Sequence, residues 1–129
     1  MHDTITRPGT TLLLGAPPRM SITATAERTI VAVTGELDLA VTDRLAARLV
    51  DELDLAPRAL VIDLTQLAFC SARGLGVVLD AVAAARVRQI PVAVLAEGRE
   101  VVRPVQALGL EDVLPLYRTL ADAEEHHDQ

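Results

Sequence analysis

ALVIDLTQLAFCSARGLGVVLDAVAAA, residues 59–85, is the stretch that decides the fold of this chain. It opens with the apolar, β-branched run at 60–62, which is typical of a strand buried on both faces. After Ser71 the apolar residues follow helical spacing, at Leu75, Val78, Leu79 and Val82. A central strand therefore leads through a short loop into a buried helix. Ligands and partners commonly meet α/β folds at loops of this kind, beyond the carboxyl ends of the strands.

The residues before this stretch predict an antiparallel hairpin and an amphipathic helix. Residues 21–26 and 29–34 are rich in β-formers, and the short turn Glu27-Arg28 separates them. We expect residues 35–40 to form a loop with two carboxylates, and Thr42 to cap the next helix. The helix then follows from apolar residues that recur every four positions, at Val41, Leu45, Leu49 and Leu53.

The residues after it predict two further strands and two short helices. Residues 90–95 form a parallel-type strand, and a helix follows that contains Pro104 and ends at Leu108, with Gly109 just beyond its end. Pro104 either belongs to the first turn of that helix or distorts it. We expect a last strand over 112–117 and a terminal helix that begins at Thr119.

These elements predict a single α/β domain over residues 19–123. Right-handed crossovers between successive parallel strands give a mostly parallel sheet with an antiparallel first edge strand and about four helices. Proline and glycine punctuate residues 1–18, which we expect to be a flexible N-terminal lead-in. Residues 124–129 are expected to form a polar C-terminal tail.

Composition narrows the classes of function. The formal net charge of -6 disfavours nucleic acid as a partner, because phosphate binding requires a basic patch. No apolar run approaches the ~20 residues of a membrane span, and the single Cys fits a reducing cytosol. We therefore expect a cytoplasmic protein that contacts neither nucleic acid nor membrane. The adjacent His126 and His127 would point to different faces of a helix, so we expect no metal site and no cofactor.

Three groups of residues, in this order, resemble the STAS domain of bacterial anti-sigma-factor antagonists. The first is Gly-Glu-Leu-Asp-Leu-Ala at 35–40, and the second is Val-Ile-Asp-Leu at 61–64 with the Ser-Ala-Arg-Gly-Leu-Gly loop at 71–76. The third is Leu-Gly-Leu-Glu-Asp-Val-Leu-Pro at 108–115. The resemblance covers about Met20 to Ala123, which is nearly the whole predicted domain.

The resemblance implies a domain that binds an anti-sigma factor with a serine-kinase-like fold and so frees a sigma factor. The family has Asp-Ser-Ser or Asp-Ser-Thr before the Gly-Leu, and the partner phosphorylates the first Ser to switch binding off. Here Ser71 takes the Asp position, Ala72 the acceptor position and Arg73 that of the second hydroxyl residue. The switch is therefore either lost or transferred to Ser71, the phosphorylation candidate. The expected partner-binding residues are Glu36, Asp38, Ser71, Ala72, Arg73 and Gly74.

Other interpretations compete at several of these residues. Ser71 also suits the N-cap of the following helix, and Arg73 is either solvated or paired with a partner's carboxylate or phosphate. Glu36 and Asp38 form either an acid/base pair or a partner-contact loop, and the second fits better because no nucleophile or metal cluster lies nearby. Cys70 occupies the place of a phosphatase nucleophile, but the loop after it lacks the required Arg, so we expect a small buried residue.

We therefore predict an anti-sigma-factor antagonist that regulates transcription by partner switching and has no catalytic activity. One alternative is a STAS adaptor subunit of a lipid transporter or of a stress-signalling complex. A second, from another class, is a small Cys-dependent phosphatase, which would lose its turnover on Cys70→Ala.

Overall fold

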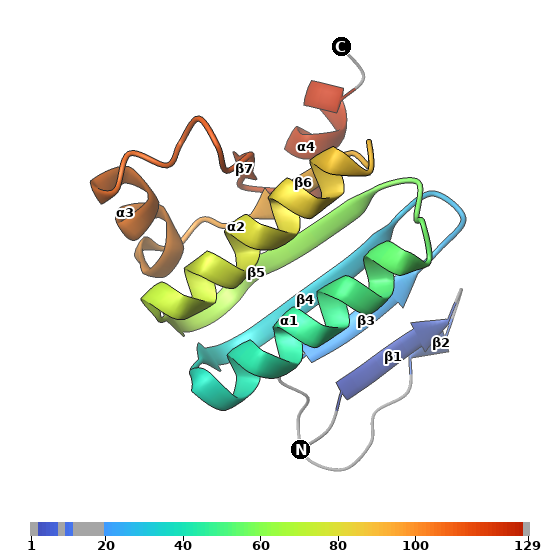
Figure 1. The fold of residues 1–129 in the computed structure, drawn as a ribbon, viewed down its shortest axis with the longest axis horizontal. Coiled ribbons are helices and arrows are strands. Elements are labelled where there is room, and N and C mark those ends of the chain that lie inside the picture. Colours follow the sequence, from blue (N-terminus) through green and yellow to red (C-terminus); the bar gives the residue numbers. More distant parts are fainter. Residues whose placement is uncertain (1–2, 8–9, 12–19, 128–129) are drawn as a thin grey trace.

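The computed structural model describes residues 3–7, 10–11 and 20–127. Its elements alternate between strands and helices after an initial run of strands, as Figure 1 shows. In chain order they are β1 (Asp3–Arg7), β2 (Thr10–Thr11), β3 (Met20–Ala24), β4 (Thr29–Leu37), α1 (Leu39–Asp54), β5 (Leu60–Cys70), α2 (Ala72–Val87), β6 (Val92–Leu95), α3 (Arg99–Ala107), β7 (Leu116–Tyr117) and α4 (Leu120–His127).

Within the described residues the strands form one mixed sheet in the order β2-β1-β3-β4-β5-β6-β7. The predicted hairpin is confirmed, because β3 and β4 pair antiparallel with Ile22 opposite Val31. From β4 to β7 all pairs are parallel. β3 is not the edge strand, because β1 pairs parallel with it and β2 pairs antiparallel with β1. The predicted α/β fold with a mostly parallel sheet and an antiparallel edge is therefore confirmed.

The helices cover the two faces of the sheet unequally. Alternate residues of the central strands, such as Ile62 and Val94, belong to the main core with apolar residues of α1, α2 and α3. Their neighbours Val61 and Ala93 face the other way and pack with Ala123 of α4. Figure 1 shows α1 and α2 side by side across one face. The apolar run at 60–62 is thus buried on both faces because helices lie on both sides of β5.

Two local predictions around the start of α1 are wrong, and of the strand expected over 112–117 only Leu116–Tyr117 forms. Residues 35–37 do not form a loop but continue β4, because β5 extends as far as Cys70 and gives them a strand to pair with. The pairing shifts register next to Gly35, whose φ of +80° favours glycine. Thr42 does not cap α1. The N-cap is Asp38, four residues earlier than expected, so the helix begins at Leu39 and Thr42 is buried inside it.

The expected N-terminal lead-in and C-terminal tail both contain regular secondary structure. β1 and β2 lie within the segment that we expected to be a flexible lead-in, whose residues 1–2, 8–9 and 12–18 lie outside the described residues. At the other end, α4 continues through residues 124–127 of the expected polar tail, and residues 128–129 lie outside the described part. The domain boundaries themselves stay predictions.

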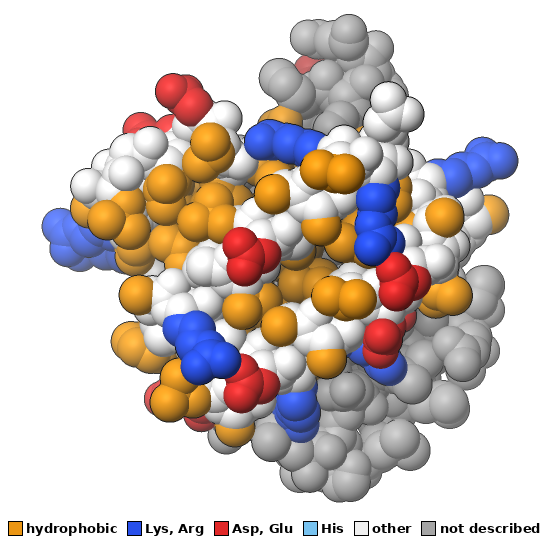
Figure 2. All heavy atoms as spheres, viewed as in Figure 1, with side chains coloured by type: hydrophobic (Ala, Val, Ile, Leu, Met, Phe, Trp, Pro, Cys, Tyr) orange, Lys and Arg blue, Asp and Glu red, His pale blue; other side chains and the backbone are white. Residues whose placement is uncertain are grey.

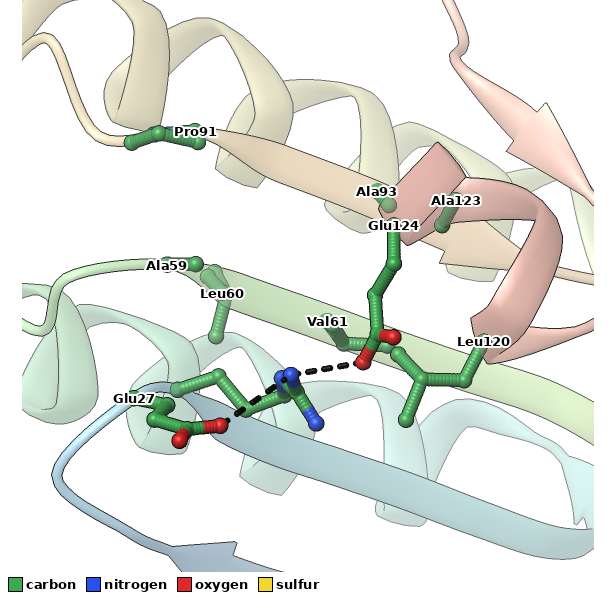
Figure 3. Close-up of a pocket in the computed structure, with 10 residues that line it drawn as sticks. Glu27, Ala59, Leu60, Val61, Pro91, Ala93, Leu120, Ala123 and Glu124 are labelled. Carbon is green, nitrogen blue, oxygen red and sulfur yellow. Dashed lines mark hydrogen bonds and ion pairs between the residues drawn. The ribbon is translucent and has the colours of Figure 1, made fainter. Parts of the chain in front are cut away.

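A hollow of about 320 Å³ opens beside α4, at the end of the sheet where β5 and β6 begin. Figure 3 shows Leu120 and Ala123 of α4 facing the sheet residue Val61 across it. Arg28 lies on its rim, with Nη2 2.6 Å from Oε1 of Glu124 and 3.5 Å from Oε2 of Glu27. The ion pair with Glu124 connects the β3–β4 turn to α4, at the opposite end of the strands from the loops that the sequence singled out.

Candidate functional site

Two neighbouring parallel strands bring the two predicted motifs together. Leu37, the last residue of β4, pairs with Cys70, the last residue of β5, and Glu36 pairs with Phe69. The backbone N–H of Ser71 then donates to the carbonyl of Leu37 at 3.4 Å. Each strand passes directly into a helix, so the first turns of α1 and α2 start beside each other at one end of the sheet.

Asp38 begins α1 as its N-cap. Its backbone is extended, with φ -86° and ψ -177°, and its Oδ1 accepts the backbone N–H of Val41 at 3.1 Å. A helix leaves its first N–H groups without intrahelical partners, and a carboxylate both satisfies one of them and complements the helix dipole. Asp38 is partly buried, so this predicted surface residue also has a structural role.

Ser71 begins α2 in the same way. Its Oγ accepts the backbone N–H of Gly74 at 3.0 Å, which confirms the N-cap interpretation. Gly74 is buried because Leu37, at the end of β4, lies directly against it. A Cβ at this position would lie 2.7 Å from Cδ2 of Leu37, so only glycine allows the two helix starts to approach this closely.

Arg73 connects the two helices across their first turns. Its Nη2 lies 2.7 Å from Oδ1 of Asp43 in α1. Both side chains are more than half exposed, at 61% and 65%, so the pair contributes little to stability. It does hold the Arg73 guanidinium over the loops. The carboxylate that Arg73 contacts is therefore one of this chain's own residues.

The remaining predicted residues contribute exposed surface. Glu36 and Ala72 are exposed on β4 and at the start of α2. Two large apolar side chains lie among them. Leu39, the first residue of α1, is 62% exposed, and Phe69, near the end of β5, is 52% exposed. The six predicted site residues thus gather at one end of the sheet. Gly74 is buried there, and the other five form a mixed charged and apolar surface with Leu39 and Phe69.

Cys70 lies directly before this loop. Desolvation by burial raises the pKa of its thiol from 9.0 to about 11, and the Sγ donates to the carbonyl of Ser71 at 3.6 Å. A nucleophilic cysteine needs its pKa lowered by positive charge or a helix N-terminus, which is the opposite shift. The thiol stays protonated at neutral pH, which weighs against the phosphatase alternative.

Sequence reasoning missed two features of this site. Asp43 lies off the apolar stripe of its helix, and only the parallel placement of α1 and α2 brings it to Arg73. Phe69 is an exposed residue near the end of β5, which is longer than the strand that the apolar run at 60–62 predicts. The sequence does single out Phe69, because it is the one Phe of the chain and lies two residues before Ser71.

Within the described residues, no group of His, Cys and acidic side chains is arranged to hold a metal ion. None of the described helices is both long and apolar enough to cross a membrane.

Several solved structures share this fold. An anti-sigma factor antagonist from Mycobacterium paratuberculosis is 28% identical, with a TM-score of 0.71, over 85% of this chain and 93% of that one. A putative anti-sigma factor antagonist from Thermotoga maritima is 16% identical, with a TM-score of 0.77, over 85% and 95%. The Bacillus cell fate determinant SpoIIAA in its phosphorylated form is 18% identical, with a TM-score of 0.65, over 83% and 97%.

Sequence comparison defines the family. No curated protein matches this chain in sequence. The family model described as the STAS domain, however, matches residues 19–123, and this range contains both helix starts and all six predicted site residues. The chain therefore belongs to the STAS domain family.

Proposed function

We propose that this chain is an anti-sigma-factor antagonist, which binds a kinase-like anti-sigma factor and so frees a sigma factor. The observation that carries the proposal is the meeting of the two motifs at the helix starts Asp38 and Ser71. The antagonist from Mycobacterium paratuberculosis, which matches over most of both chains, supports the same function.

The chemistry of the surface supports protein binding over catalysis. Exposed Leu39 and Phe69 offer apolar area, and the charges of Glu36 and Arg73 lie beside them. Protein interfaces combine apolar and aromatic anchors with a polar rim in this way. Chemistry on a substrate would instead require a nucleophile or base with a pKa suited to it, and the Cys70 thiol is protonated at neutral pH.

In the proposed mechanism, the antagonist surface is complete without modification. The partner's kinase-like site would face the start of α2, where Ala72 offers no hydroxyl and Ser71 uses its Oγ to accept the N–H of Gly74. Binding would therefore depend on the concentrations of the two proteins more than on a phosphate at this loop. Ser71 remains the phosphorylation candidate because it is the one hydroxyl residue among residues 70–76.

The test is pairwise titration calorimetry of the purified chain against each purified kinase-like anti-sigma factor of its source organism. We expect one of them to bind, and Glu36→Arg to weaken that complex without unfolding the chain, since Glu36 is exposed and caps no helix. Asp51→Arg is the matched control, because it makes the same change of charge at an exposed carboxylate in the last turn of α1, away from the starts of α1 and α2.

Asp38 needs a variant that separates charge from capping. Asp38→Asn keeps an oxygen that accepts the Val41 N–H and removes the charge, whereas Asp38→Ala removes both. Binding by none of the anti-sigma factors would overturn the proposal in favour of the adaptor alternative. Equal affinity of the wild type, Glu36→Arg and Asp38→Asn would place the interface elsewhere on the domain.

A further inference from the structure

A shallow hollow of about 390 Å³ lies beside the candidate site, between the end of β5 and α3. Its wall on the β5 side includes Phe69, and α3 contributes Arg99, Arg103, Pro104 and Ala107. We call these five residues the α3 patch. All but the half-buried Pro104 are exposed, so the hollow opens to solvent with aromatic and proline carbon on its walls and two guanidinium groups at its edge.

The positive charge of the α3 patch is available for a partner. Arg99 and Arg103 are one helical turn apart and therefore on the same side of α3, and neither makes an ion pair with any described residue. Glu100 also borders the hollow, but its carboxylate folds back against Gly98, where an added Cβ would collide with it. There it faces the helix N-terminus, whose dipole favours a negative charge.

The α3 patch continues the surface formed by the two motifs. Phe69 pairs in register with Glu36 on the neighbouring strand, so the hollow begins one strand away from the predicted partner-binding residues. A partner that covers the starts of α1 and α2 would reach Phe69 without a gap. A protein–protein interface of ordinary size buries about 800 Å² of surface on each partner. We expect the starts of α1 and α2 alone to offer less surface than this.

We propose that the α3 patch is a second contact for the same partner and takes an acidic segment that carries one apolar side chain. The apolar side chain fills the hollow against Phe69 and Pro104, and carboxylates on either side of it pair with Arg99 and Arg103. This inference rests on the proposed function, because it assigns the chemistry of the anti-sigma factor's surface. In a chain with net charge -6, two arginines that make no ion pair with the described residues and lie beside an aromatic side chain select for a complementary acidic segment.

The first experiment measures affinity for the anti-sigma factor that binds the wild type. Phe69→Ala and Arg103→Glu should each weaken binding by about tenfold, the effect of losing one anchor residue. The Arg103→Glu effect should shrink at high salt, where exposed charges are screened. The control Arg58→Glu makes the same change of charge at the other end of the sheet and should leave affinity unchanged.

The outcomes separate the two proposals. If Glu36→Arg weakens the complex while Phe69→Ala and Arg103→Glu do not, the α3 patch proposal is overturned and the proposed function stands. If concentration-dependent self-association of the chain is lost in Phe69→Ala instead, the patch binds a second copy and the proposal is again wrong.

A second experiment needs no anti-sigma factor. The probe is a short synthetic peptide with glutamates on both sides of a leucine, and its twin has glutamines in their place. NMR titration should shift the backbone signal of Phe69 and the side-chain Nε–H signals of Arg99 and Arg103 with the acidic peptide only. Equal shifts with both peptides, or shifts confined to other arginines, would show that this surface has no preference for an acidic segment.

Discussion

Asp38 and Ser71 each combine two roles that usually fall to different residues. Each side-chain oxygen accepts a backbone N–H in the first turn of the helix it begins, and each lies on the surface where a partner is expected. The caps fix the direction in which α1 and α2 leave the sheet. Substitutions at these positions therefore change stability and binding together, and experiments must use variants that keep the cap.

Ser71→Ala should lower the free energy of unfolding by about 1 kcal/mol, because the Gly74 N–H loses its acceptor. Ser71→Asp retains an acceptor at the same position and should keep most of that stability. Urea unfolding followed by circular dichroism measures both variants. A loss as large in Ser71→Asp as in Ser71→Ala would show that the cap does not stabilise α2.

The Cys70 thiol should make stability depend on alkaline pH. Its pKa is raised from 9.0 to about 11 in the folded chain, so the folded state holds the proton more tightly than the unfolded state. The resulting stabilisation is complete below pH 9.0 and is lost as pH rises to about 11. Unfolding free energies measured across this window should fall for the wild type. They should fall less for Cys70→Ala, and parallel slopes would contradict the raised pKa.

At the scale of elements, the close approach of the two helix starts depends on Gly74 and Leu37. Leu37 is fully buried at the end of β4, and its side chain occupies the space that any Cβ on Gly74 would need. The β4–β5 pairing fixes Leu37 in place, so it cannot move away without disturbing the sheet. The geometry of the surface is therefore set by one glycine–leucine contact between two elements.

Gly74→Ala should destabilise the chain by about 1–3 kcal/mol through this overlap, despite the higher helix propensity of alanine. Leu37→Ala alone should cost about 2–5 kcal/mol, because it leaves a cavity. Together the two substitutions should cost less than the sum of their separate effects, since the new methyl group enters the space that the leucine leaves. Simple additivity in the double-mutant cycle would show that the two residues do not compete for space.

The end of α2 offers a stabilising substitution. Gln89 follows the C-cap residue Arg88 with φ +60°, and Ile90 donates its N–H to the carbonyl of Ala85 at 2.8 Å. This left-handed position costs a side chain about 1 kcal/mol, and glycine adopts it freely. Gln89→Gly should therefore raise the free energy of unfolding by about 0.5 kcal/mol or more. A lower free energy of unfolding for Gln89→Gly, measured by thermal unfolding, would mean that the Gln89 side chain stabilises the end of α2.

The order and type of the elements from β3 onward were predictable from residues, and the ends of the elements at the site were not. Leu45 and Leu49 recur at helical spacing and are buried as expected, because periodicity reports which face meets the core. The start of α1 was missed because Asp38 and Thr42 are both good caps, and only the pairing of β4 with β5 decides between them. The contact between Arg73 and Asp43 depends on tertiary placement, which no local pattern contains.

At the scale of the whole molecule, both motifs lie at one end of the parallel sheet, and the ion pairs of Arg28 lie at the other end. Figure 2 shows α1 and α2 with hydrophobic side chains between them and acidic and basic side chains together near both ends. Across those ends Arg73 pairs with Asp43, and Arg88 with Asp54 at 2.8 Å. The buried apolar residues of both helices belong to the same core, so a partner would meet a preformed surface and not a loop that must first become ordered.

A preformed surface leaves regulation to depend on whether a phosphate can be added to it. We expect the cognate kinase-like anti-sigma factor, incubated with this chain and ATP, to leave Ser71 unmodified. The kinase must align a hydroxyl with the γ-phosphate, and the position where the family carries that hydroxyl is Ala72. Ser71 lies one residue earlier, and its Oγ is engaged with the N–H of Gly74.

Ala72→Ser is the matched variant for this last prediction. Ala72 is exposed at the first position of α2, so serine there should fold normally and restore the acceptor. Mass spectrometry should find phosphate on Ala72→Ser and none on the wild type. Phosphate at this position would add about -1.5 to -2 charges at the start of α2 and should release the partner. Stoichiometric phosphate on Ser71 of the wild type, abolished in Ser71→Ala together with partner release, would show instead that the switch has moved by one residue.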